Sequence, residues 1–472
     1  MRGSAIDLQA LGRMIDGDVV VPDSPEYEAE IRVFNARFHE VRPQAIVRCA
    51  NPHDVAEAIS FVRRHGLEHA ARSGGHSFAG HSSTQGVVID VSPMCSISVD
   101  GEVATVGAGA RLGDVYDALD EHDLAIPAGT CPPVGIAGFT LGGGLGILGR
   151  KHGVLSDRLL RAEIVLADGR VVQADEHHHG DLFWALRGAG GGNFGVVTSL
   201  ELRTVPAPNV TNFHLSWPFS NADSVIDGWQ RWAPNAPNEL AASLKITDAG
   251  DPDRLQAVDV YGALSEGEPD AAWLVDRLVA LVASDPTSAV STAMDFTQTR
   301  RFWANLGSDE AAVDPQAAQP EQPYLFAKSE FFRRLLPADT IAALLEAFTE
   351  ERAAGQTREL DFMPWGGAYN AVPADATAFV HRSELFQIKH AVVVDPSAWT
   401  DAKEAVHRQV VRSWGSVHPF GSGRVFQNFA DPDLENWADA YYGGNLGRLL
   451  AVKARYDEEN FFRFHQSLPM RG

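Results

Sequence analysis

The chain has 472 residues, which is more than one hydrophobic core usually serves, so we expect two lobes. Its hydrophobic content of 45% includes no run of about 18 apolar residues, which argues against a membrane-spanning helix. The formal net charge of −23 repels phosphate backbones and disfavours nucleic acid as a partner.

The beginning of the chain and its cysteines indicate the compartment. Residues 1–7 lack the apolar core of a signal peptide, so we expect a cytoplasmic protein. Three cysteines are too few, and odd in number, for a disulfide framework, and none is spaced for a metal site. Cys49 and Cys95 lie in apolar contexts and are predicted to be inert core residues.

The first 206 residues alternate short strands with amphipathic helices. A helix is predicted to begin after Asn51, where an N-cap residue precedes a proline, and to end at Gly66. A hairpin is predicted over 162–174, with its turn at Asp168 and Gly169. Apolar spacing predicts a helix over 112–119 and further strands at 45–49, 69–72, 86–91 and 103–107.

The pattern changes after the Pro-Ala-Pro segment at 206–208. The following stretch has little glycine patterning and no phosphate loop, so it reads as a separate, substrate-facing lobe. Residues 311–322 are predicted to form a mobile loop. Strands are predicted at 214–217, 244–247 and 257–261, and helices at 271–283 and 338–351.

Two glycine runs carry the strongest chemical signal. One spans 72–77 and contains His76; the other spans 129–135 and contains Cys131. Glycine lets a backbone approach a ligand closely, and consecutive backbone N–H groups hold phosphate oxygens. Imidazole and thiolate are both good nucleophiles. An electrophilic cofactor could therefore be attacked at two points.

At these residues the sequence resembles the berberine bridge enzyme-like oxidases of the p-cresol methylhydroxylase/vanillyl-alcohol oxidase superfamily. The resemblance continues through the segments Gly138 to Gly146, Asp181 to Gly188, Tyr441 to Asn445 and Asp457 to Phe462. It implies an FAD cofactor, with His76 bonded to the flavin 8-methyl carbon and Cys131 bonded to ring carbon C6.

The resemblance also implies the fold and the residues around the cofactor. The fold is α+β, with a two-lobed FAD-binding architecture and a separate antiparallel-sheet substrate domain. The expected FAD-binding domain is 1–206, with its core at about 40–206; 207–423 bind substrate, and 424–472 return to the FAD domain. The implied cofactor-binding residues are Arg72, Ser73, Gly74, Gly75, His76, Ser77, Thr130, Cys131, Gly135, Gly138, Gly142, Gly143, Gly146, Val197 and Asn445.

Two other patterns point to chemistry that we do not adopt. Residues 144–149 match the Gly-x-Gly-x-x-Gly motif of dinucleotide-binding folds. That motif follows a hydrophobic strand, however, and a loop is expected before these residues. Residues 177–179 are three histidines, but neighbours on an extended chain point to opposite faces and no further ligand pattern completes a metal site. No metal is predicted.

Tyr441 and Tyr442 are the candidates for the acid–base role. Oxidising an alcohol requires removal of its hydroxyl proton, which a tyrosine performs only if its pKa of about 10 is lowered. An aromatic pair before a helix is equally typical of packing. Near the end of the tail, Asn445 is predicted to cap a helix.

Two residues depart from the family pattern. Leu446 stands where relatives often have an aromatic residue, and Phe426 where many have tyrosine. Both changes weaken a detailed substrate assignment. Gln427, Tyr369 and Lys389 are further polar candidates.

The favoured interpretation is an FAD-dependent oxidase acting on a CH–OH group of a sugar, oligosaccharide or glycosylated natural product, with O₂ as acceptor and H₂O₂ as product. A dehydrogenase using another acceptor, and a flavin-carrying binding protein without turnover, remain alternatives. The expected partners are a small-molecule substrate and O₂, without nucleic acid or membrane.

Overall fold

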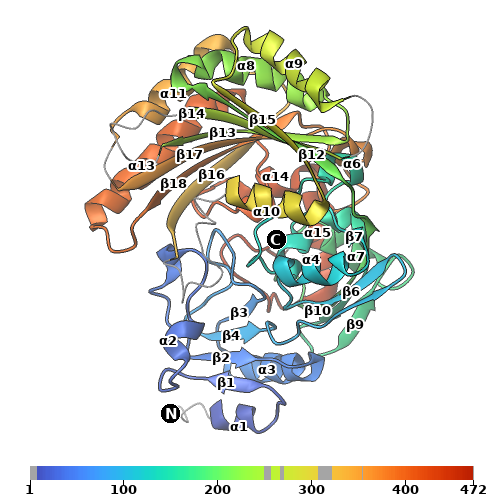
Figure 1. Ribbon diagram of the computed structural model, residues 1–472. Coiled ribbons are helices and arrows are strands. Elements are labelled where there is room, and N and C mark those ends of the chain that lie inside the picture. Colours follow the sequence, from blue (N-terminus) through green and yellow to red (C-terminus); the bar gives the residue numbers. More distant parts are fainter. Residues whose placement is uncertain (1–7, 249–256, 266–269, 307–321, 353–354, 471–472) are drawn as a thin grey trace.

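The computed structural model describes residues 8–248, 257–265, 270–306, 322–352 and 355–470. All but the last residue of the loop predicted at 311–322 therefore lie outside the described residues. The described chain forms a lower lobe with a four-stranded, a five-stranded and a two-stranded sheet, and an upper lobe with one large sheet (Figure 1).

The first sheet of the lower lobe has the order β1-β2-β4-β3. Its strands are β1 (Asp18–Val20), β2 (Ala45–Arg48), β3 (His69–Arg72) and β4 (Val87–Asp90), and β2, β4 and β3 run parallel. Helix α3 (Pro52–His65) crosses over between β2 and β3. The side chain of Asn51 accepts a hydrogen bond from Asp54 N at the helix start, and Gly66 ends the helix in a left-handed conformation. Both predicted helix ends are confirmed.

The second sheet is antiparallel and has the order β5-β6-β10-β8-β9. Its strands are β5 (Ile97–Asp100), β6 (Val103–Gly107), β8 (Leu159–Val165), β9 (Val171–Ala174) and β10 (Val196–Arg203). Gly169, with φ of +83°, makes the predicted hairpin turn between β8 and β9. Shorter elements complete this lobe: α1 (Leu8–Gly12), α2 (Tyr27–Glu30), α4 (Leu112–Asp120), β7 (Leu124–Ala125), α5 (Ile136–Leu141), α6 (Gly149–His152), α7 (Gly180–Leu186) and β11 (Val205–Pro206).

The upper lobe is built on a seven-stranded antiparallel sheet with the order β15-β12-β14-β13-β17-β18-β16. Its strands are β12 (Val210–Pro218), β13 (Leu240–Asp248), β14 (Ala257–Ser265), β15 (Ser288–Met294), β16 (Tyr324–Phe332), β17 (Gln356–Pro364) and β18 (Phe386–Val394). The antiparallel substrate-side sheet expected from the sequence is confirmed.

Alternation along these strands separates two faces. Leu244, Leu360 and Ile388 belong to the core under the helices, whereas their neighbours in sequence point the other way. The helices on the outer face are α8 (Ala222–Trp232), α9 (Ala271–Val282), α11 (Ala338–Thr349) and α13 (Thr400–Val417) (Figure 1). The opposite face looks toward the lower lobe, with α10 (Phe296–Leu306) packed on β12 and β15 (Figure 1). Helix α12 (Ala368–Ala371) packs on α6 of the lower lobe.

The C-terminal tail returns to the lower lobe through α14 (Trp437–Tyr442) and α15 (Leu446–Tyr456), and α15 packs on α7. The Lys453 ammonium is fully buried and donates to the carbonyl oxygens of Asn193 and Phe462 and to the Asp457 carboxylate, at 2.6–2.8 Å. One buried cation thus ties the tail to a loop of the lower lobe.

Three local predictions were wrong. Residues 138–141, expected in a loop, belong to α5, because tertiary packing overrides the low helix propensity of this glycine-containing stretch. Asn445 stands at the N-cap position of α15, but its side chain makes no capping hydrogen bond and instead donates to the carbonyl oxygens of Ala374, Thr377 and Ala378. Cys95 is exposed, whereas Cys49 is buried as predicted.

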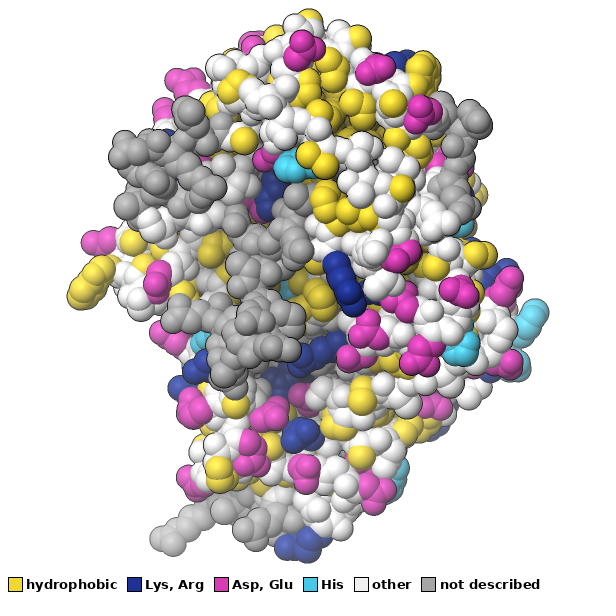
Figure 2. Space-filling model, in the orientation of Figure 1, with side chains coloured by type: hydrophobic (Ala, Val, Ile, Leu, Met, Phe, Trp, Pro, Cys, Tyr) yellow, Lys and Arg dark blue, Asp and Glu magenta, His cyan; other side chains and the backbone are white. Residues whose placement is uncertain are grey.

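Charged side chains of both signs are present on the surface. On the face drawn in Figure 2, acidic and basic side chains are interspersed over the described residues. No helix among the described residues is long and apolar enough to cross a membrane.

The buried ion pair of the tail gives a first prediction. Replacing Lys453 by Met should lower the free energy of unfolding by about 3–5 kcal/mol, because it leaves the Asp457 carboxylate buried without its cation. Urea unfolding followed by tryptophan fluorescence measures the change. The matched control is Arg231→Gln, which removes an exposed pair with Asp227 and should cost no more than about 1 kcal/mol. Equal effects of the two variants would contradict the prediction.

Candidate active site

His76 and Cys131 lie beside each other, although 55 residues separate them in the chain. The Cys131 sulfur is 3.9 Å from the Nε2 atom of His76. The imidazole ring stacks on Phe34, with ring centroids 3.7 Å apart. The stacked ring fixes the plane of the imidazole, so its nitrogen and the sulfur are held at one place on the same wall.

The two glycine runs meet at Gly74 and Gly135. A Cβ atom on Gly74 would overlap the backbone N of Gly135, and a Cβ on Gly135 would overlap the backbone N of Gly74. Ser73 donates its hydroxyl proton to the carbonyl oxygen of Ala108 and fixes the start of the first run. The absence of side chains at both glycines is therefore what allows His76 and Cys131 to approach.

Burial sets the protonation state of the histidine. Desolvation, together with the charge of Arg111, lowers the pKa of His76 to about 4. The imidazole is therefore neutral at pH values well above 4 and keeps a lone pair for bond formation.

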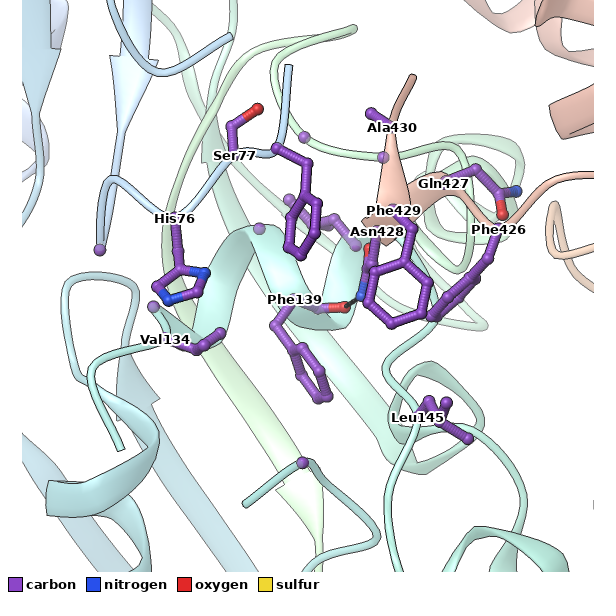
Figure 3. A pocket seen from close by; sticks show the side chains of 18 of the residues that line it. His76, Ser77, Val134, Phe139, Leu145, Phe426, Gln427, Asn428, Phe429 and Ala430 are labelled. Carbon is purple, nitrogen blue, oxygen red and sulfur yellow. Dashed lines mark hydrogen bonds between the residues drawn. The ribbon is translucent and has the colours of Figure 1, made fainter. Parts of the chain in front are cut away.

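The two nucleophiles line a cavity of 470 Å³ between the lobes. Its walls come from both lobes and from the tail, including Phe426 to Ala430. Figure 3 shows the rings of Phe139, Phe426 and Phe429 across the cavity from His76. The side chain of Asn428 donates to the carbonyl oxygen of Phe139 and holds the tail segment against α5.

Most of the predicted cofactor residues gather on this wall, and three do not. Gly142 and Gly143 pack behind it against Asn428 and Phe379, and Asn445 is buried among backbone carbonyl groups. The sequence suggested contact for these three because they lie within matching motifs. The residues that line the cavity are Arg72, Ser73, Gly74, Gly75, His76, Ser77, Thr130, Cys131, Gly135, Gly138, Gly146 and Val197.

The lower-lobe end of the cavity fits a long, polar cofactor such as FAD. Several buried polar atoms of described residues that line this end have no hydrogen-bond partner, among them Arg72 Nη2, His69 Nε2, His81 Nε2 and Ser82 Oγ. Buried polar groups are normally satisfied, so these atoms indicate a ligand rich in hydrogen-bonding groups. The glycine backbone nearby can accept phosphate oxygens.

Tyr441 and Tyr442 also line the cavity, but their hydroxyl groups are engaged in the protein. Tyr441 accepts from Asp431 N and donates to Gln466, and Tyr442 donates to the carbonyl oxygen of Ala189. Burial raises the pKa of both tyrosines. Their catalytic role stays a prediction, and this geometry favours a positioning role.

Two of the other polar candidates are also engaged in hydrogen bonds to the protein. Gln427 donates to the carbonyl oxygens of Gly188 and Tyr441, and Tyr369 donates to that of Gly146, so both hold backbone in place. Phe426 lines the cavity. Leu446 is half-buried in the packing of the tail and is not among the cavity-lining residues that the structure describes.

Lys389 belongs to a charged group on the sheet that sequence reasoning mostly missed. Lys245 on β13, and Glu359 and Asp361 on β17, line the cavity with it. The sequence held a partial signal, since Lys245 and Asp361 each stand between two apolar residues of a strand.

The three consecutive histidines serve local structure. His178 bonds the Asp175 carboxylate, and His179 contacts the hydroxyl of Tyr456. Among the residues that the structure describes, no three His, Cys, Asp or Glu side chains are grouped as ligands of a metal ion.

Comparison with known proteins defines the class. Residues 43–175 match the model of an FAD-binding domain, and residues 425–469 match a family described as berberine and berberine like. The chain is 33% identical to the FAD-linked oxidoreductase YvdP of Bacillus subtilis, over 96% of this chain and 98% of that protein. It is 30% identical to berberine bridge enzyme-like 1 of Arabidopsis thaliana, over 96% of this chain and 90% of that protein.

Solved structures agree with this fold. BBE-like 1 of Physcomitrella patens superimposes with a TM-score of 0.86 at 28% identity, covering 99% of this chain and 100% of that one. A chitooligosaccharide oxidase gives a TM-score of 0.85 at 25% identity, covering 98% and 99%. The protein is thus an FAD-linked oxidoreductase. It belongs to the berberine bridge enzyme-like family of the p-cresol methylhydroxylase/vanillyl-alcohol oxidase superfamily.

The contact between the glycine runs can be tested directly. Replacing Gly135 by Ala should reduce bound flavin strongly, because the added Cβ pushes the Gly74 backbone away and separates His76 from Cys131. The ratio of visible flavin absorbance to protein absorbance measures binding. Gly415→Ala, in helix α13 with open space around the added carbon, is the matched control and should bind flavin normally. Full flavin content in Gly135→Ala would refute the argument.

Proposed function

We propose that the protein is an oxidase that holds FAD through two covalent bonds and oxidises a CH–OH group of a sugar, oligosaccharide or glycosylated compound, with O₂ as acceptor and H₂O₂ as product. One observation carries the proposal: a neutral imidazole and a sulfur lie 3.9 Å apart on the wall of the cavity between the lobes. His76 is the residue proposed to bond the flavin 8-methyl carbon, and Cys131 the residue proposed to bond ring carbon C6.

The flavin supplies a two-electron acceptor when it is bound. The chain supplies the position of that acceptor and the binding of substrate. Covalent attachment leaves fewer noncovalent contacts to be made around the ring, so the rest of a 470 Å³ cavity stays available to a bulky substrate.

The cavity wall supports a substrate with many hydroxyl groups. Lys245, Glu359 and Lys389 offer charged donors and acceptors on the sheet, and the rings of Phe426 and Phe429 offer flat apolar faces. Sites of this kind bind a ligand through apolar contact and orient it through a few polar groups. The similarity to a chitooligosaccharide oxidase is consistent with a carbohydrate substrate.

Both attachment points can be tested by substitution. His76→Ala and Cys131→Ala should each retain one bond, so acid precipitation of either variant should still give a yellow pellet. The double variant should release its flavin to the supernatant, because no nucleophile of the pair remains. Absorbance of pellet and supernatant, with peptide mass mapping, measures the outcome. A coloured pellet from the double variant would contradict the assignment.

The choice of acceptor is tested by reoxidation. The wild-type protein is reduced anaerobically with glucose, cellobiose, diacetylchitobiose or benzyl alcohol, then mixed with oxygenated buffer in a stopped-flow instrument. We expect rapid return of the oxidised flavin spectrum and one H₂O₂ per turnover. Slow return with oxygen, together with fast return with a quinone, would identify a dehydrogenase instead. A flavin that none of the four compounds reduces would favour a binding protein without turnover.

A further inference from the structure

Four charged side chains meet on the cavity face of the large sheet. Asp361, on β17, is the direct cross-strand partner of Lys245 on β13 and of Lys389 on β18. Glu359 lies two residues before Asp361 and therefore on the same face. All four residues line the cavity. Three adjacent strands thus present a row of alternating charge to the space where a substrate binds.

The two lysines converge on Glu359. Lys245 Nζ is 2.7 Å from Glu359 Oε2, and Lys389 Nζ is 3.0 Å from Glu359 Oε1. Burial alone would raise the pKa of Glu359, but the two ammonium groups outweigh it and hold that pKa well below its usual range. Glu359 is therefore a fixed negative charge and a poor acceptor of protons.

Asp361 is the second carboxylate among the described residues that line the cavity. Its Oδ2 atom is 3.7 Å from Lys389 Nζ, and its side chain keeps 15% of its surface exposed. An aspartate in this position can reach a ligand in the cavity.

The charged row and the flavin attachment site share one cavity. The Lys389 ammonium lies 5.5 Å from the centre of the Phe429 ring. Rings in contact then continue from Phe429 to the histidine, with centroid distances of 5.4, 5.8 and 3.7 Å for the pairs Phe429–Phe78, Phe78–Phe34 and Phe34–His76. These ring contacts connect the charged row, through Lys389, with the wall that carries His76.

The tyrosines of the cavity are unsuited to remove a proton. Burial raises the pKa of all four of them, which are Tyr261, Tyr369, Tyr441 and Tyr442. The hydroxyl groups of the last three also bond groups of the protein. A phenol with a raised pKa is a weaker acid at neutral pH and is scarcely present as the phenolate that a base requires.

We propose that Asp361 is the general base that accepts the hydroxyl proton of the substrate, and that Glu359 is the counter-ion that fixes Lys245 and Lys389 around it. The inference rests on the proposed function, because it assigns the proton of that same oxidation. It replaces the tail tyrosines as the base and leaves them as positioning residues.

The step balances with groups already named. The carbon-bound hydrogen leaves with its two bonding electrons for the flavin. The O–H bond of the substrate breaks, its electron pair becomes the second bond of the new carbonyl group, and the proton forms an O–H bond on the Asp361 carboxylate. That proton then passes to solvent, and the carboxylate is restored.

The proposal fixes the direction of the pH dependence. Asp361 accepts a proton only when it is ionised, so the rate should fall as pH falls through the pKa of this carboxyl. The charged and titratable groups that face it are Lys245 from β13, Lys389 from β18, Glu359 from β17 and Tyr261 from β14. Burial lowers the pKa of Lys245, but the Glu359 charge overcomes this, and the net shift is upward. This lysine therefore stays charged across the acidic range.

The experiment compares Asp361→Asn with the wild-type protein, using whichever of glucose, cellobiose, diacetylchitobiose and benzyl alcohol reduces the wild-type flavin fastest. The variant should keep its flavin content and visible spectrum. We expect anaerobic flavin reduction to slow by about 10²–10⁴-fold and the acidic fall of the rate to disappear. Asp361→Glu, which restores a carboxylate, should recover part of the rate.

Two sets of controls separate the outcomes. Asp259→Asn is a matched change on β14 at a carboxylate bonded to His214 and Ser216, and it should leave the reduction rate unchanged. Tyr441→Phe and Tyr442→Phe should retain the acidic fall. Reduction of Asp361→Asn within about tenfold of wild type, or loss of the acidic fall in a tyrosine variant instead, overturns the base assignment alone. A wild-type flavin that no compound reduces overturns the proposed function together with it.

Discussion

The contact between the backbones at Gly74 and Gly135 is the constraint on which the active site depends. It brings two loops, one after β3 and one between β7 and α5, so close that neither glycine has room for a Cβ atom. His76 follows one contact point by two residues, and Cys131 precedes the other by four. Backbone packing therefore brings the two side chains to a separation of 3.9 Å.

The cavity also requires that the two lobes keep their relative position. Arg150, which is 2% exposed, donates from the lower lobe to the carbonyl oxygens of Trp365 and Ala236 in the upper lobe. Arg382 forms a bidentate pair with Asp157 at 2.6 and 2.8 Å. Buried guanidinium groups that lose their partners are costly, so these contacts resist separation of the lobes. These contacts between the lobes therefore help to keep the shape of the cavity wall.

The sequence predicted those parts of the molecule that local patterns encode. Asn51 and Gly66 mark the ends of α3, and His76 and Cys131 stand in glycine runs whose text alone suggested a shared ligand. A loop was predicted at residues 138–141, but they belong to helix α5. Tertiary packing of Ile136 and Leu141 stabilises this helix, and local helix propensity does not include that packing. The predicted burial of Cys95 was wrong for a related reason, because apolar neighbours in the sequence do not determine whether a residue is buried in the fold.

The sequence could not predict that the charged residues of the large sheet lie next to one another. Alternation shows that Lys245, Asp361 and Lys389 each lie on a strand face, but it does not show that 116 residues of chain fold back to place Lys245 opposite Asp361. Register is a property of the whole sheet.

Burying four charges is expensive, and an apolar sheet face of the same shape would serve stability as well or better. The apolar face under the helices, where Leu244, Leu360 and Ile388 pack, shows that these strands can be built that way. Lys245, Glu359, Asp361 and Lys389 stand on the face that meets the cavity. Four charges in the wall of the cavity are therefore better explained by the proposed binding and proton transfer than by a gain in stability.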